Sequence, residues 1–108
     1  MKQLIVNADD FGLHESINEA VERAHRDGIL TSASLVVNGD AFEHAVDIAK
    51  RNPRLGVGIH LTLSGERPVA PVEEVASLLD TQQRLHERHT QFCVDLLRGK
   101  IRLHEIVR

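Results

Sequence analysis

The 108-residue sequence is poor in cysteine and aromatic residues, with one cysteine, three phenylalanines and neither tyrosine nor tryptophan. The single Cys93 excludes an internal disulfide and a zinc site built from cysteines. The N-terminal segment MKQLIVNADD reaches a charged pair after a few apolar residues, which is too short a run for a signal peptide or a membrane-spanning helix. We therefore expect a cytoplasmic protein.

An excess of basic residues is also lacking. The 13 lysines and arginines are outnumbered by 16 aspartates and glutamates, which gives a net charge of −3. Because binding to a phosphate backbone requires a basic face, we expect no nucleic-acid partner. The 42% of hydrophobic and 27% of charged residues are typical of a globular protein rather than a disordered chain. Histidine is abundant, with seven residues, and it serves as metal ligand and proton carrier near neutral pH.

The hydrophobic pattern predicts strands that alternate with helices. Short apolar segments predict strands at residues 3–8, 32–37 and 55–61. Apolar residues at helical spacing predict two helices between them, with stripes formed by Ile17, Ala20, Val21 and Ala24 and by Phe42, Ala45, Val46 and Ala49. After a proline-marked loop, shorter helices are predicted at 72–79, at 90–98 and from 103 onward. The β-α-β-α-β order predicts parallel strands joined by right-handed crossovers.

Polar residues that can carry chemistry follow each predicted strand. Asp9 and Asp10 follow the first, Asn38 the second, and His60 ends the third. In parallel α/β sheets, ligands bind beyond the carboxyl ends of the strands. Adjacent strand residues point in different directions, so one acid can bind a cation while the other acts as a general base, and His60 can supply a nitrogen ligand. The alternative is that the acid pair only caps the following helix.

Three further residues are candidates for lining a substrate site, and each has a structural alternative. Asn38 precedes Gly39 and fits a turn equally well. Arg67 can reach a substrate hydroxyl or carboxylate, or can be a solvated loop residue. Phe11 lies beside the acids and can form a wall of the site, or can pack in the core as most phenylalanines do.

Three ordered motifs, NADDFG, LTSASLVVNG and LGVGIHLTLSGERPV, resemble the YdjC-like carbohydrate deacetylase family. This family includes the diacetylchitooligosaccharide deacetylases of the ChbG type and the hopanoid-biosynthesis-associated protein HpnK. The resemblance extends over residues 2 to about 70, with weaker agreement at residues 77–80. It implies an α/β fold: a parallel βαβαβ portion of a deformed (β/α) TIM-like barrel of the polysaccharide deacetylase type. Residues 1–108 would form a single, truncated N-terminal part of that domain.

The resemblance also implies the chemistry, which is the metal-dependent removal of the acetyl group from an N-acetylated sugar or oligosaccharide. By position, Asp9 is the general base that activates a metal-bound water, and Asp10 and His60 are metal ligands. The implied cofactor is a divalent cation, Mg²⁺ first and Zn²⁺ as the alternative. Family members bring a third histidine ligand and a general acid from a later segment. The remaining C-terminal histidines do not lie at predicted strand ends and are not assigned: His86, His89 and His104.

Two other functions compete with this one. The chain can be a catalytically incomplete fragment or remnant that acts only as a metal-binding, sugar-binding or interaction module. It can also be a receiver-type signalling domain, which has a similar length and a magnesium-binding acid pair, although His60 lies where such domains need a phospho-accepting aspartate. The sequence is compatible with a homo-oligomer.

Overall fold

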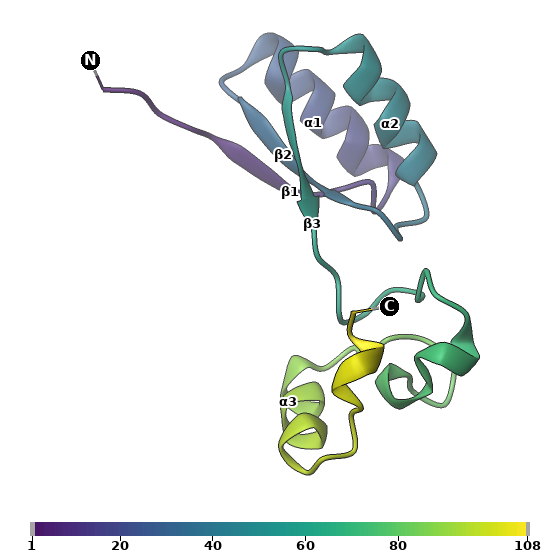
Figure 1. Cartoon of the computed structure of the whole chain (residues 1–108). Helices are drawn as coiled ribbons and strands as arrows, with labels where there is room; N and C mark the ends of the chain where they lie inside the picture. Colours follow the sequence, from purple (N-terminus) through teal and green to yellow (C-terminus); the bar gives the residue numbers. More distant parts are fainter. Residues whose placement is uncertain (1, 108) are drawn as a thin grey trace. The chain divides into compact units, whose positions relative to one another are not determined.

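The computed structural model describes residues 2–107 and divides into two compact units, unit 1 up to Leu61 and unit 2 from Thr62 onward. Unit 1 contains strands β1 (Asn7–Phe11), β2 (Ser32–Val36) and β3 (Gly56–His60) and helices α1 (Glu15–Asp27) and α2 (Phe42–Arg51). The three strands are parallel and lie in the order β1-β2-β3 (Figure 1). The predicted α/β class with parallel βαβαβ connectivity is confirmed.

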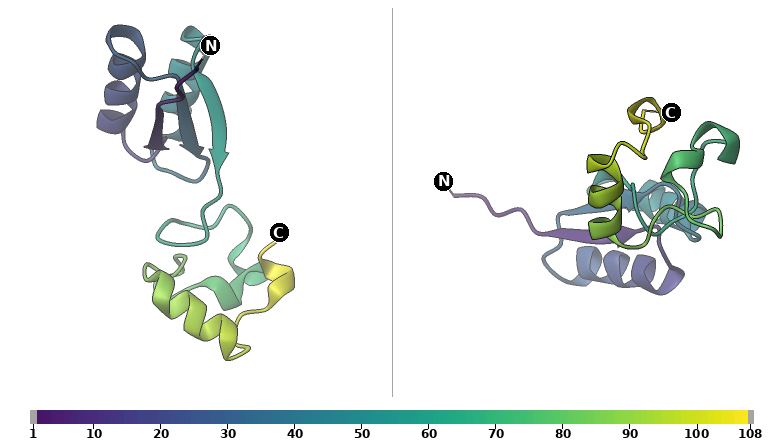
Figure 2. Two further views of the ribbon diagram at one scale, coloured as in Figure 1. Left: turned by 90° about the vertical axis from the view of Figure 1, so that its left-hand side faces the viewer. Right: turned by 90° about the horizontal axis from the view of Figure 1, so that it is seen from below.

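Both helices cover the same face of the sheet (Figure 2). Since βα crossovers are right-handed, a sheet whose strands follow in sequential order must place successive helices on one side. A receiver-type domain has its first strand between the second and the third. The observed order has β2 in the middle, so the receiver interpretation is wrong.

The core of unit 1 lies between the sheet and the two helices. Its buried side chains come from β1, β2, both helices and the connecting segments: Phe11, Val21, Leu30, Ala33, Ala45, Ile48 and Leu55. The predicted stripe of α2 is confirmed at Ala45. On α1 the prediction is half wrong, because Ala20 and Ala24 are exposed while the polar Asn18 is fully buried.

The first strand begins later than its hydrophobicity predicts. Residues 3–6 are not part of a strand, and Leu4 and Ile5 are 77% and 79% exposed. The reason is pairing. The register of β1 with β2 begins at Asn7 opposite Ser32, so Leu4 and Ile5 lie beyond the start of the strand with which they would have to pair.

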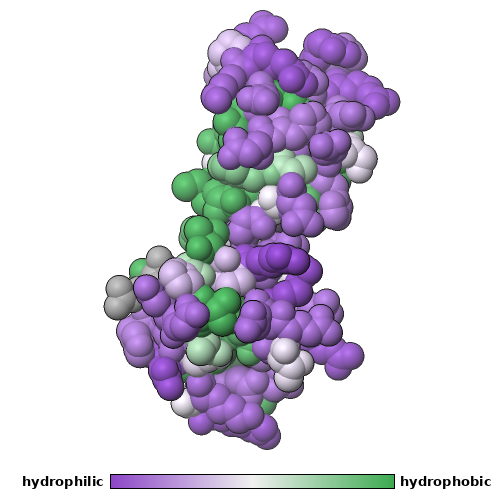
Figure 3. All heavy atoms as spheres, turned by 90° about the vertical axis from the view of Figure 1, so that its right-hand side faces the viewer, coloured by the Kyte–Doolittle hydropathy of each residue, from purple (hydrophilic) through white to green (hydrophobic). Residues whose placement is uncertain are grey.

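Strand β3 lies at an edge of the described sheet and differs from the buried strand that its sequence predicts. Its apolar residues Val57 and Ile59 are 42% and 70% exposed. Figure 3 shows hydrophobic residues gathered along one border of unit 1. The helices α1 and α2 cover mainly β1 and β2, so the helix-facing side of β3 is left open among the described residues.

Unit 2 consists of short elements around a second small core. It contains α3 (His89–Leu97) and 3₁₀ turns at Val72–Glu74, Ala76–Leu78 and Leu103–Glu105. The predicted helices at 72–79 and from 103 are therefore 3₁₀ turns. The buried apolar side chains are Val75, Leu78, Leu85 and Ile101. No helix within residues 2–107 is long and apolar enough to cross a membrane.

A buried carboxylate joins two of these turns. Glu105 is almost fully buried and accepts hydrogen bonds of 2.8 Å from both the backbone N–H and the hydroxyl of Ser77. Burial alone would raise the pKa of Glu105, but these bonds and the guanidinium of Arg102 outweigh it and hold the pKa below its usual range.

Candidate functional site

The acid pair lies inside β1 and not after it, at an irregularity of the strand. Ala8 pairs with Ala33 and Phe11 with Leu35, so β1 uses one more residue than β2 over the same length. This is a β-bulge, and it contains Asp9 and Asp10. Asp10 has a φ of 62°, in the left-handed region that aspartate tolerates better than most residues. Bulges of this kind change the direction of a side chain and often lie next to active sites.

The bulge changes the direction of Phe11. Without the extra residue, Ala8 and Phe11 would lie on opposite faces, because strand side chains alternate. With it, both face the helices, and Phe11 is 0% exposed in the core of unit 1. Phe11 therefore packs in the core, and its prediction as a substrate-lining residue is wrong.

The structure brings together Asp10 of β1 and His60 of β3, which are the two edge strands of the described sheet. Oδ1 of Asp10 lies 3.9 Å from Nδ1 of His60, and both side chains remain partly open to solvent, at 53% and 37%. His60 is the last residue of β3 and pairs with Val36. The interpretation of the acid pair as a helix cap is wrong, because α1 begins after His14 and no side chain among the described residues caps it.

These two side chains fit part of a cation site. Two donor atoms that each bind one divalent cation at about 2.1 Å lie roughly 3.0–3.4 Å apart, so a shift of about half an ångström would let both bind. Carboxylate oxygen and imidazole nitrogen suit several divalent metals. Within residues 2–107, no group of three or more histidine, cysteine, aspartate or glutamate side chains is placed to hold a metal. Among the described residues, Asp10 and His60 would thus be two ligands of such a site.

Asp9 points to the face of the sheet opposite the helices and is held by an amide. Nδ2 of Asn7 donates to Oδ1 of Asp9 over 3.1 Å and to the hydroxyl oxygen of Ser34 over 3.0 Å. The hydroxyl of Ser32 donates to Oδ1 of Asn7 over 2.8 Å. The sequence motif contains Asn7, but sequence reasoning assigned it no role.

A buried amide connects the loops that follow β1 and β2. Oδ1 of Asn18 accepts a 2.6 Å hydrogen bond from the backbone N–H of Gly12, and Nδ2 donates to the carbonyl of Ala41 over 2.9 Å. Asn18 is fully buried, so water cannot replace these bonds. Sequence reasoning missed it, although its spacing beside Ile17 and Val21 places it on the inner face of α1.

The loops also meet directly. The backbone N–H of Ala41 donates to the carbonyl of Gly12 over 3.0 Å. A Cβ atom at Gly39 would overlap that same carbonyl oxygen, so only glycine permits the approach. Asn38 lies half-buried in this turn, as the turn interpretation predicts. The loop that follows β1 and the loop that carries Asn38 are thus fixed to each other by backbone contact and by Asn18.

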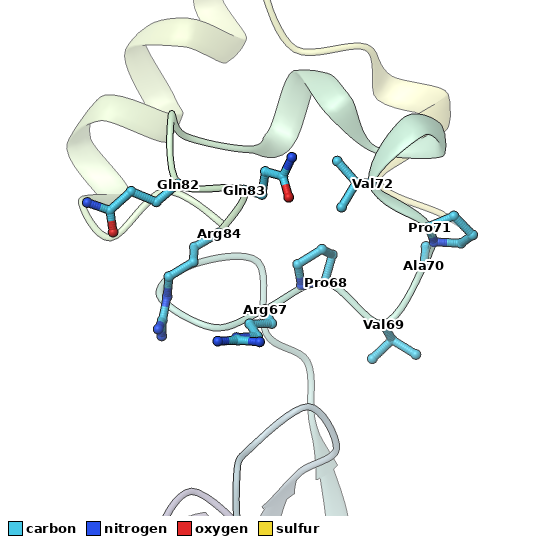
Figure 4. A pocket seen from close by; sticks show the side chains of 9 residues that line it. All are labelled: Arg67, Pro68, Val69, Ala70, Pro71, Val72, Gln82, Gln83 and Arg84. Atoms are coloured by element: carbon cyan, nitrogen blue, oxygen red, sulfur yellow. The ribbon is translucent and has the colours of Figure 1, made fainter.

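Arg67 lies in unit 2, where it lines a cavity of about 680 Å³ (Figure 4). The lining combines two guanidinium groups and two carboxamides with proline and valine side chains. Arg84, the second arginine, donates to the carbonyl of Gly65 over 2.8 Å and lies 3.8 Å from Glu66. The cavity can accept polar, hydrogen-bonding ligands, and the role of Arg67 in binding substrate stays a prediction.

Comparison with known proteins gives a consistent picture. The family model described as YdjC-like protein matches residues 3–108. A carbohydrate deacetylase of Brevibacillus brevis is 52% identical over 82 residues, which is 76% of this chain and 32% of that protein. A chitooligosaccharide deacetylase of Proteus mirabilis is 48% identical over 69 residues, which is 64% of this chain and 27% of that protein. The chain spans about a third of the length of these curated relatives.

A solved structure has the same fold. The protein is from Enterococcus faecalis and is provisionally described as a cellobiose-phosphate cleavage protein. It matches with a TM-score of 0.79 and 30% identity, over 94% of this chain and 38% of that one.

Proposed function

This chain belongs to the YdjC-like protein family, and from that premise we propose that it carries part of the active site of a metal-dependent carbohydrate N-deacetylase. The observation that carries the proposal is the distance of 3.9 Å between Oδ1 of Asp10 and Nδ1 of His60. Asp9 lies next to Asp10 in the bulge of β1. The names of the relatives, carbohydrate deacetylase and chitooligosaccharide deacetylase, support an N-acetylated sugar as substrate.

In this proposal Asp10 and His60 hold a divalent cation, Mg²⁺ or Zn²⁺. A cation bound there would polarise the acetamide carbonyl and stabilise the negative charge that develops on its oxygen. A third ligand is needed, because the described residues supply two. The proposed substrate is a chitooligosaccharide or the sugar of a hopanoid lipid, and the proposed location is the cytoplasm.

Asp9 is the general base of the proposed reaction. Hydrolysis breaks the C–N bond of the acetamide, with a hydroxyl group added to the acetyl carbon and a hydrogen to the amine. A carboxylate within hydrogen-bond reach of the attacking water takes the proton that this water loses. One oxygen of Asp9 accepts from Asn7, and among the described residues its second oxygen, Oδ2, accepts no hydrogen bond and can face the water.

The alternative is a module that binds metal or sugar without catalysis. The observation in its favour is that the described residues form no group of three metal-binding side chains. The two functions differ in acetate release, because a module of this kind binds sugar or cation and leaves the acetamide intact.

The test is acetate release from N-acetylated chitooligosaccharides by the full-length protein that carries this sequence. The protein is first treated with a chelator and then supplied with Mg²⁺ or Zn²⁺. We expect Asp9→Asn to abolish acetate release while the cation still binds, and His60→Ala to weaken cation binding as well. Asp47→Asn is the matched control, because Asp47 lies on the exposed side of α2. Full activity of Asp9→Asn would remove Asp9 from the mechanism, and binding without acetate release by the unmodified protein would favour the module.

A further inference from the structure

Four polar side chains form a network on the face of the sheet that the helices do not cover: Asn7, Asp9, Ser32 and Ser34. Their position follows from the alternation of the strands, because Ala8, Ala33 and Leu35 between them pack in or against the core on the other face. Asn7 pairs directly with Ser32 across β1 and β2. The amide of Asn7 is the centre of this network, since every bond within it involves that group.

The two ends of the Asn7 amide face different partners. An ionised carboxylate only accepts hydrogen bonds, so the NH₂ group and not the carbonyl oxygen must face Asp9. The carbonyl oxygen then faces Ser32, whose hydroxyl donates to it over 2.8 Å. Ser32 and Asp9 therefore favour the same orientation of the amide.

We propose that Asn7 is a positioning residue that holds the carboxylate of Asp9 in place for the reaction, and that Ser32 sets the orientation of the Asn7 amide. This proposal rests on the proposed function, in which Asp9 is the base. The amide occupies Oδ1 of Asp9 over 3.1 Å and so leaves Oδ2 available to the attacking water. A carboxylate that rotates freely would spend less time in the reactive geometry, and misplacement by about an ångström can reduce a rate about a hundredfold.

Ser32 and Ser34 provide a matched pair of variants. Both lie on β2, on the same face, and both contact Asn7, but at opposite ends of its amide. Ser34 accepts from the same nitrogen that donates to Asp9, so its loss leaves the bond to Asp9 intact. Loss of the Ser32 hydroxyl removes the group that holds the carbonyl end and frees the amide to turn. A purely structural role of the network predicts similar effects for the two serines.

The kinetic experiment uses acetate release by the full-length protein that carries this sequence. We expect Asn7→Ala to lower kcat about tenfold to a hundredfold, with KM within about twofold and cation binding unchanged. Ser32→Ala should lower kcat about fivefold, and Ser34→Ala should leave it within about twofold. Equal losses in the two serine variants, or an Asn7→Ala variant with full kcat beside an inactive Asp9→Asn, would overturn the positioning role alone. An active Asp9→Asn would overturn the base assignment as well.

A second measurement needs no activity. In ¹⁵N NMR spectra of the full chain, we expect the side-chain NH₂ of Asn7 to exchange slowly with solvent and to give two well-separated proton shifts. Ser34→Ala should keep that signature, and both Ser32→Ala and Asp9→Ala should move it towards that of a free amide. If the Asn7 signals already match a free amide in the unmodified chain, the network does not hold in solution and the proposal is wrong.

Discussion

On one face of the sheet in unit 1, apolar side chains pack against α1 and α2, while on the other face polar side chains of the same strands bond to one another. Strand β1 contributes to both. Ala8 and Phe11 face the helices, and Asn7 and Asp9 face away. The difference shows how closely core and site are coupled in this fold, because one bulge decides which residues belong to each.

The bulge resolves a conflict in the local sequence. Regular alternation would place Phe11 on the polar face and turn Asp10 towards the helices, where an unpaired charge is costly. The extra residue places Phe11 in the core and lets Asp10 approach His60. The left-handed backbone of Asp10 is the local strain that accompanies this arrangement.

The largest expected difference between the two faces comes from removing the aromatic ring of Phe11 from the helix-covered face. Phe11→Ala should cost about 3–5 kcal/mol of unfolding free energy, because the ring is fully buried and leaves a cavity. Asp9→Ala, two residues away on the polar face, should change it by less than about 1 kcal/mol. Urea unfolding followed by circular dichroism measures both. Similar small values for the two variants would show that the bulge does not direct Phe11 into the core.

Asn18 is a buried polar residue on the helix-covered side of the sheet. Its replacement tests how much its hydrogen bonds contribute to the free energy of unfolding. Asn18→Leu keeps the size of the side chain but leaves the N–H of Gly12 and the carbonyl of Ala41 without their partner. We expect a loss of about 2–4 kcal/mol. Ala20→Ser, on the exposed side of the same helix, should change stability by less than about 0.5 kcal/mol. Thermal and urea unfolding would contradict this account if Asn18→Leu were as stable as the unmodified chain.

Two glycines differ in how closely other backbone atoms approach them. A Cβ at Gly39 would overlap the carbonyl oxygen of Gly12, and the two loops would have to separate. Gly39→Ala should therefore cost about 1–3 kcal/mol. A Cβ at Gly58, in β3, meets nothing within 4 Å, so Gly58→Ala should be neutral or slightly stabilising. Equal stabilities of the two variants in denaturant unfolding would mean that the loop contact is not maintained in solution.

The sequence alone was sufficient for the arrangement of unit 1. Alternating apolar segments and helical stripes predicted the order and direction of its elements, because the crossover rule leaves few topologies for such a pattern. It also predicted that Asp10 and His60 would meet, since strand ends of a parallel sheet lie at one edge. Their roles as ligands, and that of Asp9 as base, remain predictions.

What the sequence did not reveal depends on partners distant in the chain. The hydrophobicity of Leu4 and Ile5 predicts that they belong to the strand. They are exposed instead, because the pairing of β1 with β2 begins only at Asn7 opposite Ser32. The sequence around a bulge does not reveal the extra residue either. The face of the sheet to which Phe11 points could therefore not be predicted. Asn18 was overlooked because helical periodicity selects apolar residues, whereas its burial follows from two backbone groups in distant loops.

An ion pair joins the two helices on their outer surface. Arg51 of α2 donates two hydrogen bonds, of 2.6 and 2.7 Å, to the carboxylate of Glu22 on α1. The Arg51 guanidinium, followed by the amide of Asn52, lowers the pKa of Glu22 from its ordinary value of 4.5 to about 2. A carboxyl whose pKa is depressed in the folded state stabilises the fold above its unfolded pKa. That contribution is lost as the pH falls from about 4.5 towards 2.

Because Arg51 is half-exposed, solvent screens the pair, and Glu22→Gln should cost only about 1 kcal/mol at pH 7. Glu19→Gln, an exposed acid on the same helix, is the matched control and should have almost no effect. Urea unfolding at pH 7 and near pH 2 should show the difference between the two variants at the higher pH and its near disappearance at the lower one. A difference that persists at pH 2, or that does not shrink in 1 M salt, would show that packing rather than charge joins the two helices on this side of the layer.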